Sequence, residues 1–232
     1  MNQSRFANRL LAGLPRKNSQ LLLARLEPVT LTFGDELYRP REAIRHVYFP
    51  GDCMVSMLAL VDGHLALEVG LVGHEGMLGV PLALGVRDSP VRALVQGSGT
   101  ALRMKTAPFL KEFRQNAPLR RAVHRYAYDL MVQVTQTAAC NRFHEVEARL
   151  ARWLLMTRDR VLSNQFRLTQ AMLSGMLGVL RVAVTKAAST LQKRKLIRYS
   201  RGEIHILDGN ALEAAACQCY QIVKVVPAVS LA

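Results

Sequence analysis

The sequence predicts an α+β protein with a β-rich N-terminal part, a long central helix and a C-terminal winged helix-turn-helix. Three patterns predict this fold. Short alternating apolar runs broken by glycine fill residues 29–105, apolar residues spaced four and three apart follow over 117–139, and residues 168–208 combine two helical patterns with a hairpin pattern. We therefore divide the chain into a β-roll sensor or effector domain (1–115), a dimerisation helix (116–140) and a winged helix-turn-helix DNA-binding domain (141–232).

Length and composition limit the possible classes of protein. A chain of 232 residues is long enough for two modest domains with their own cores. No apolar run approaches the ~20 residues that span a bilayer, and the N-terminus shows no secretory signal. We expect a cytoplasmic protein that does not act at a membrane. The net charge of +14 favours a polyanionic partner.

The N-terminal part begins with a helical pattern and continues as strands. The helix of residues 10–26 is interrupted at Pro15. We expect strands at 29–33, 47–49, 53–61, 64–72, 91–96 and 100–105, and a short helix at 106–115. Asp62-Gly63, between two of these strands, is a strong signal for a two-residue hairpin turn. Several short strands with such turns indicate an all-β sandwich or roll.

The central helix carries apolar residues in the pattern of a coiled-coil seam. The predicted dimerisation residues are Leu119, Val123, Tyr126 and Leu130. An alternative is that this face packs on the β-rich domain of its own chain. A further helix over 142–161, with a hinge at Asn141, would connect the seam to the C-terminal domain.

Two short helical segments separated by a glycine predict the helix-turn-helix. Thr169 can cap the first helix, and Gly178 allows a tight turn before a second helix from Arg181 to about Lys193. The outward face of the second helix would carry Arg181, Val182, Thr185, Lys186 and Ser189. Such donors near a helix N-terminus are typical of a helix that reads the DNA major groove.

A hairpin follows the second helix and completes a winged motif. Residues 196–199 and 203–207 alternate with a period of two, and Ser200-Arg201-Gly202 forms the turn. Residues 163–208 contain eight Lys or Arg against two acidic residues, which suits phosphate binding. We add Thr169, Gln170 and Arg201 to the predicted DNA-binding residues. The tail reads as one helix over 211–226, closed by Pro227.

Residues 168–207, together with VEARLARWLLM at 146–156, resemble the C-terminal domain of the Crp/Fnr superfamily of bacterial transcription regulators. With the N-terminal half, the resemblance covers nearly the whole chain. It implies a cyclic-nucleotide-binding-like β-roll (double-stranded β-helix), a homodimer on a roughly palindromic operator in double-stranded DNA, and RNA polymerase as a partner. Arg181 and Lys186 match positions that contact bases and phosphates. Val182 replaces a usual Glu and predicts an altered operator, with a thymine methyl against it. Leu180 replaces a usual capping residue.

The glycine-rich stretch 70–79 resembles the phosphate-binding cassette of that family. Gly76, Met77 and Leu78 lie in the cassette, and Met77 takes the position of the Glu that binds ribose. Ser89 and Pro90 take the positions of the Arg-Ser pair that binds phosphate. A cyclic phosphate would lack its counter-charge, so we predict no cyclic AMP binding in the family manner. Arg87 or Arg92 offers a substitute cation.

The sequence shows no catalytic, metal or cofactor motif. The six histidines lack HxH, HxxxH and HExxH spacing, and Cys217-Gln218-Cys219 is too short for an arm of a zinc knuckle. We treat the four cysteines as structural or incidental, identify no cofactor and expect no enzyme. The open alternatives are a regulator that senses thiol chemistry or another small molecule, and a β-roll binding module or enzyme whose C-terminal domain serves for association.

Overall fold

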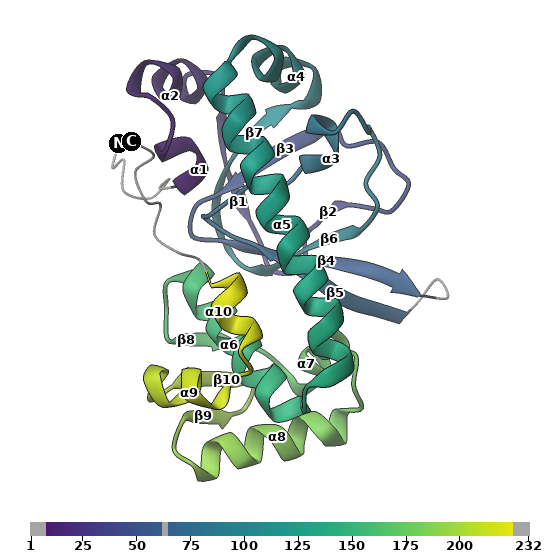
Figure 1. Cartoon of the computed structure of the whole chain (residues 1–232), viewed down its shortest axis with the longest axis vertical. Coiled ribbons are helices and arrows are strands. Elements are labelled where there is room, and N and C mark those ends of the chain that lie inside the picture. Colours follow the sequence, from purple (N-terminus) through teal and green to yellow (C-terminus); the bar gives the residue numbers. More distant parts are fainter. Residues whose placement is uncertain (1–7, 62–64, 225–232) are drawn as a thin grey trace. The chain divides into compact units, whose positions relative to one another are not determined.

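The computed structural model describes residues 8–61 and 65–224, which form two compact units (Figure 1). The N-terminal unit contains residues 8–57 and 72–131, and the C-terminal unit contains 58–61, 65–71 and 132–224. These units differ from the predicted domains at two places. The C-terminal unit begins inside the long helix, and it includes parts of two strands that we assigned to the β-roll. The predicted Asp62-Gly63 turn lies outside the described residues.

Two sheets supply the β-structure of residues 27–105, as the alternating pattern predicts. The strands are β1 (Glu27–Leu31), β2 (Glu36–Tyr38), β3 (His46–Pro50), β4 (Met54–Val61), β5 (Leu65–Val72), β6 (Arg92–Gly97) and β7 (Gly99–Lys105). One sheet has the strand order β1-β7-β3 and the other β2-β6-β4-β5. In the first sheet Glu27 pairs with Arg103 and His46 with Lys105. The sequence did not predict β2, because three residues are too few for a recognisable alternation.

Four short helices accompany the sheets of the N-terminal unit. They are α1 (Arg9–Ala12), α2 (Arg16–Leu23), α3 (Val80–Ala83) and α4 (Thr106–Gln115). The break between α1 and α2 falls at Pro15, as predicted. Helix α3 follows Gly79, whose φ of 104° lies in the left-handed region that glycine tolerates. Leu22, Val47 and Phe49 are fully buried in the core of this unit.

The predicted dimer residues lie on the long helix α5 (Ala117–Phe143), and the prediction that their face meets a second chain needs correction. Leu119 and Val123 are fully buried, and Tyr126 and Leu130 are 7% and 8% exposed. All four belong to the apolar core of the N-terminal unit of their own chain. The four-and-three spacing therefore marks the face that packs on the β-structure, which was the alternative interpretation. The helix lies so close to Gly76 that a Cβ there would be 1.9 Å from Cζ of Tyr126.

The C-terminal unit contains the last turns of α5 and a winged helical domain. Its further elements are α6 (Val146–Val161), β8 (Gln165–Arg167), α7 (Gln170–Leu177), α8 (Arg181–Lys193), β9 (Ile197–Ser200), β10 (Glu203–Ile206), α9 (Gly209–Ala215) and α10 (Cys219–Val223). The helix α5 continues past the predicted hinge at Asn141, and the chain breaks at His144 and Glu145 instead. The predicted tail helix is two short helices, because Ala216 is extended.

Helix α6 is the centre of the C-terminal unit. Leu150, Leu154 and Leu155 are fully buried on it. The indole Nε1 of Trp153 donates a hydrogen bond of 2.6 Å to the carboxylate of Glu68, a buried residue on β5. A buried polar pair of this kind fixes the position of Glu68 and its part of β5 on α6, because either group alone would be costly to bury.

Candidate nucleic-acid interface

Helices α7 and α8 meet at an angle of 107°, within the range of about 90–120° that is typical of helix-turn-helix motifs. Thr169 caps α7, because its side chain accepts a hydrogen bond of 3.2 Å from the backbone N–H of Met172. Gly178 ends α7 in the left-handed conformation, with φ 61° and ψ 40°. Both roles were predicted from the sequence. Among the described helices none alone is long and apolar enough to cross a membrane, and only the bent pair α7 and α8 passes such a test, by length and composition.

The inward face of α8 is apolar and holds the helix in place. Val184 and Leu191 are fully buried, and Ala187 and Ala188 are almost so. On α7, the hydroxyl of Ser174 donates a hydrogen bond of 2.6 Å to the carbonyl oxygen of Val179 in the turn. Alanine at two of the four inward positions allows a close approach to the neighbouring helices. Because this face is buried, the opposite face of α8 lies at the surface.

The outward face of α8 carries the predicted DNA-binding side chains. Arg181, Val182, Thr185, Lys186 and Ser189 are all exposed, and Val182 is 71% exposed. The preceding residue, Leu180, is 77% exposed and makes no capping hydrogen bond, as predicted. The backbone N–H groups of the first turn receive no side-chain cap and add to the positive potential of this end.

Gln170 connects α7 to the outward face of α8. Its amide oxygen accepts a hydrogen bond of 3.0 Å from the hydroxyl of Thr185 and a longer one of 3.4 Å from Nε of Arg181. Thr185 also donates to the backbone carbonyl oxygen of Arg181. Two side chains that we predicted to contact DNA are therefore positioned by a third.

The wing is a three-stranded sheet with the order β8-β10-β9. Ser200 pairs with Glu203, so Arg201 and Gly202 are the central residues of a two-residue turn. Their φ angles are 51° and 78°, as a type I′ turn requires. Arg201 is exposed at the tip of this hairpin. The sequence did not predict β8, because only three residues pair with β10.

Most of the basic side chains of residues 163–208 remain available for an anion. Arg167 lies 3.8 Å from Glu203, and Arg194 lies 2.7 Å from Glu147. The other six make no ion pair with a carboxylate in the part of the chain that the structure describes: Arg181, Lys186, Lys193, Lys195, Arg198 and Arg201. This concentration of unpaired cations is what phosphate binding needs.

The residues of the predicted cassette lie in the N-terminal unit and carry no cationic side chain. Met77 and Leu78 are buried, and Ser89 is buried with its hydroxyl donating to the carbonyl oxygen of Val91 at 2.7 Å. Pro90 is exposed. Of the two possible substitute cations, Arg92 pairs with Glu36 and Arg87 is exposed. The stretch therefore has the glycines of the family's cassette, but it has no charged side chain at the positions of the family's Glu and Arg, which are Met77 and Ser89.

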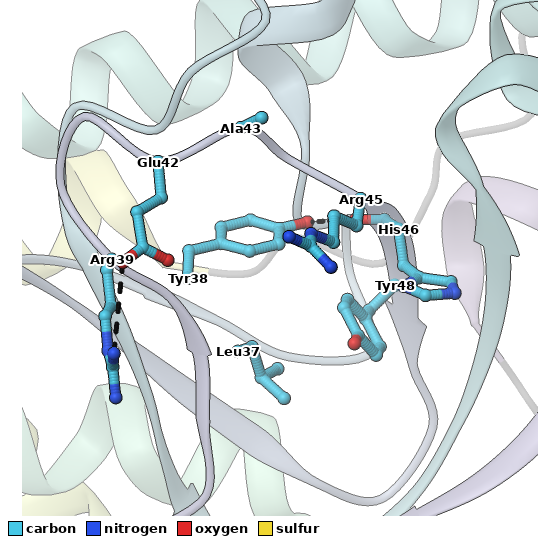
Figure 2. A pocket seen from close by; sticks show the side chains of 8 residues that line it. All are labelled: Leu37, Tyr38, Arg39, Glu42, Ala43, Arg45, His46 and Tyr48. Carbon is cyan, nitrogen blue, oxygen red and sulfur yellow. Dashed lines mark hydrogen bonds and ion pairs between the residues drawn. The ribbon is translucent and has the colours of Figure 1, made fainter.

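A small cavity lies elsewhere in the N-terminal unit, at the ends of β2 and β3. Its volume is about 150 Å³, below the ~300–1,000 Å³ of typical ligand pockets. Figure 2 shows the eight side chains that line it: Leu37, Tyr38, Arg39, Glu42, Ala43, Arg45, His46 and Tyr48. None of the five cassette residues is among them. The Tyr38 hydroxyl donates a hydrogen bond to the backbone carbonyl oxygen of His46.

The C-terminal unit also brings together four residues that sequence reasoning did not connect. Cys140, His144, Cys217 and Cys219 place their ligand atoms within 4.8 Å of one another. A hydrogen bond with the Cys140 thiol lowers the pKa of the Cys217 thiol to about 5. The available signal was the Cys-x3-His spacing at the end of the long helix, which puts both side chains on one helix face.

Taken by its geometry, the C-terminal unit is a winged helix-turn-helix with a basic, exposed second helix, the structure of a DNA-binding domain. Residues 148–215 match the model of the Crp-like helix-turn-helix domain. No curated protein sequence matches the chain significantly.

Solved structures show the same fold for most of the chain. FixK2 from Bradyrhizobium japonicum has a TM-score of 0.69 at 14% identity, covering 83% of this chain and 98% of its own. A CRP-family transcriptional regulator from Thermus thermophilus has a TM-score of 0.68 at 18% identity, covering 81% and 96%. The c-di-GMP-responsive global regulator CLP from Xanthomonas campestris has a TM-score of 0.66 at 17% identity, covering 84% and 100%. The chain thus contains a Crp-like helix-turn-helix domain at residues 148–215, and most of the chain has the fold of these solved regulators.

Proposed function

We propose that this protein is a sequence-specific, homodimeric transcription regulator of the cytoplasm that binds a roughly palindromic operator in double-stranded DNA. The observation that carries the proposal is the exposed N-terminal half of α8, with cationic and hydroxyl side chains at its surface. Arg181 reads a base edge, because a guanidinium at a recognition-helix N-terminus can bind guanine with two hydrogen bonds. Lys186 and Arg201 neutralise phosphates on either side.

The remaining outward residues of the interface tune the operator sequence. Val182 offers a methyl-sized apolar contact and no carboxylate, so it favours a thymine methyl over a cytosine amino group. Thr185 and Ser189 supply hydroxyls along the same face. Hydrogen bonds from Arg181 and Thr185 to Gln170 hold the start of α7 beside the N-terminal end of α8. Thr169 and Gln170 therefore approach the same strand of the duplex.

Dimerisation uses the other face of α5. The exposed positions of that helix include His124, Tyr128, Met131, Thr135 and Ala138, which repeat with the four-and-three spacing of a coiled-coil seam. Tyr128 and Met131 are 55% and 58% exposed, a large exposure for apolar side chains. A parallel pair of such helices would place two α8 helices about one DNA turn apart, ~34 Å.

The introduction of negative charge tests this dimer face. Tyr128→Glu combined with Met131→Glu would place acidic groups opposite each other in the pair and convert the dimer to a monomer in sedimentation velocity. Ile222→Glu, at an equally exposed position (55%) on α10, is the control and leaves the dimer intact. A double variant that sediments as wild type would exclude this face.

The effector is not cyclic AMP bound in the family manner, because the cassette positions offer a buried thioether, a bonded hydroxyl and a proline. Isothermal titration calorimetry of the purified protein with cyclic AMP would show no saturable heat at micromolar nucleotide. Saturable binding there would contradict this part of the proposal. Contact with RNA polymerase rests on the family resemblance.

Operator binding is tested by genomic footprinting at a stated salt concentration, followed by titration of one recovered site with variants. Arg181→Ala should cost about 1–3 kcal/mol, which is roughly fivefold to 150-fold in affinity, and should relax base preference at one position. Lys186→Ala should weaken binding to all DNA sequences by a similar factor. It should also reduce the slope of log affinity against log salt concentration by about 1. Lys111→Ala, on α4 of the N-terminal unit, is a charge-matched control. Both α8 variants binding as tightly as this control would refute the assignment.

A further inference from the structure

Four potential metal ligands come from two distant parts of the chain. Cys140 lies in the last turn of α5, and His144 follows directly after that helix. Cys217 lies between α9 and α10, and Cys219 is the first residue of α10. The three cysteines are free thiols and buried. The fold therefore brings a Cys-x3-His segment and a Cys-x-Cys segment to one point.

Two separations between ligand atoms of this cluster are close to those around a single tetrahedral ion. The sulfurs of Cys140 and Cys217 are 3.4 Å apart, and the sulfur of Cys219 lies 3.4 Å from Nδ1 of His144. With Zn–S and Zn–N bonds of about 2.3 and 2.0–2.1 Å, a tetrahedral site places two sulfurs about 3.8 Å apart and a sulfur and nitrogen about 3.5 Å apart. All four ligand atoms lie within 4.8 Å of one another, which leaves room between them for one ion and not for a multi-iron cluster.

Two buried arginines beside the cluster lack an acidic partner. Arg149 and Arg152 are 5% and 4% exposed, and neither forms an ion pair within residues 8–61 and 65–224. Each has a buried Nε without a hydrogen-bond acceptor. Arg152 lies close enough to Cys140 and Cys217 to interact electrostatically with both thiols. Buried guanidinium groups are costly unless a negative charge is near.

We propose that Cys140, His144, Cys217 and Cys219 form a Cys3His site for one Zn²⁺ ion. Three thiolates and one Zn²⁺ carry a net charge of −1, which offsets one of the two positive charges of the arginines. The side-chain amide of Gln136 donates to the Cys219 sulfur at 3.0 Å and orients that ligand from outside the site. With four protein ligands the site is closed, as structural zinc sites are. The ion would tie the end of the long helix to the link between α9 and α10.

Metal content of the full-length protein tests the proposal directly. The chain is purified under reducing conditions, stripped with a chelator, given Zn²⁺ and desalted, and its metal is then measured by mass spectrometry. We expect one Zn²⁺ per chain. Replacement by Co²⁺ should give the visible absorption of a tetrahedral site together with thiolate-to-cobalt charge transfer. A reduced, folded chain that takes up no Zn²⁺ would overturn the proposal.

Matched variants separate this site from incidental binding. Cys219→Ser and His144→Gln should each lower zinc retention by at least tenfold and change the Co²⁺ spectrum. Cys53→Ser, at a buried cysteine of the N-terminal unit, should retain one ion and the wild-type spectrum. His144 follows the last residue of α5, so its variant should keep the wild-type circular dichroism. Retention that is unchanged in both ligand variants would overturn the assignment.

Discussion

The same substitution at two glycines of the helix-turn-helix should have opposite effects on stability. Gly175 lies inside α7, and a Cβ at this position would meet no atom within 4 Å. Gly178 ends the helix with φ 61°, and a Cβ there would lie 2.6 Å from Cδ1 of Leu67. Both sites receive the same methyl group three residues apart, so the two variants differ in backbone conformation and in the contact with Leu67.

The magnitudes follow from these two environments. Gly175→Ala should stabilise the protein by about 0.5–1 kcal/mol, because alanine is the better helix former at an open position. Gly178→Ala should cost about 1–2 kcal/mol for the left-handed conformation alone, and displacement of Leu67 adds to this cost. The two variants should therefore differ in free energy of unfolding by about 2 kcal/mol or more.

Urea unfolding followed by tryptophan fluorescence measures this difference. Trp153 is the single tryptophan of the sequence and lies on α6, in the same unit as both glycines. Gly178→Asn provides a control, since asparagine tolerates the left-handed region better than alanine and should fall between wild type and Gly178→Ala. If Gly178→Ala equalled or exceeded the stability of Gly175→Ala, the description of this turn would be refuted.

Three further results are expected. Gly76→Ala should destabilise the N-terminal unit by about 1–3 kcal/mol, because its Cβ would overlap the Tyr126 ring, and Tyr126→Leu should partly rescue it in a double-mutant cycle of thermal unfolding. Glu68→Ala should cost about 1–3 kcal/mol and shift the emission of Trp153, whereas Glu68→Gln keeps an acceptor and should do less of both; unchanged emission in the alanine variant would contradict the buried hydrogen bond. Hydrogen bonds from Arg39 and, to a smaller extent, Arg92 lower the pKa of Glu36 in the folded protein. These hydrogen bonds therefore stabilise the fold fully above the pKa of Glu in the unfolded chain, near 4.3, and this stabilisation is lost as pH falls through the lower pKa of the folded state. Carboxyl titration by NMR should show the Glu36 pKa rising in Arg39→Ala.

The sequence predicts those elements whose signal is local. Thr169 and Gly178 mark the ends of α7 because capping and the left-handed turn depend on single residue types. The strands of three residues, β2 and β8, gave no such signal, because their formation depends on partners far along the chain. The outward face of α8 was also accessible from periodicity, because a helix with one apolar stripe leaves its other face outward.

The assignments that the sequence could not make depend on which surface lies opposite. Periodicity showed that Leu119, Val123 and Tyr126 share a buried face of α5, but it could not say whether that face meets a second chain or the chain's own sheets. The sequence likewise could not show that the Cys and His residues lie together. Their two short segments are separated by more than 70 residues, and only the fold brings them together.

The hydrogen bonds of Gln170 have a consequence for changing operator preference. Because this α7 side chain holds Thr185 and Arg181, the side chains of α8 are not independent modules. Transplanting α8 residues from a relative would move the donors without the amide that orients them. Redesign and natural divergence of this protein should therefore change position 170 together with positions 181 and 185.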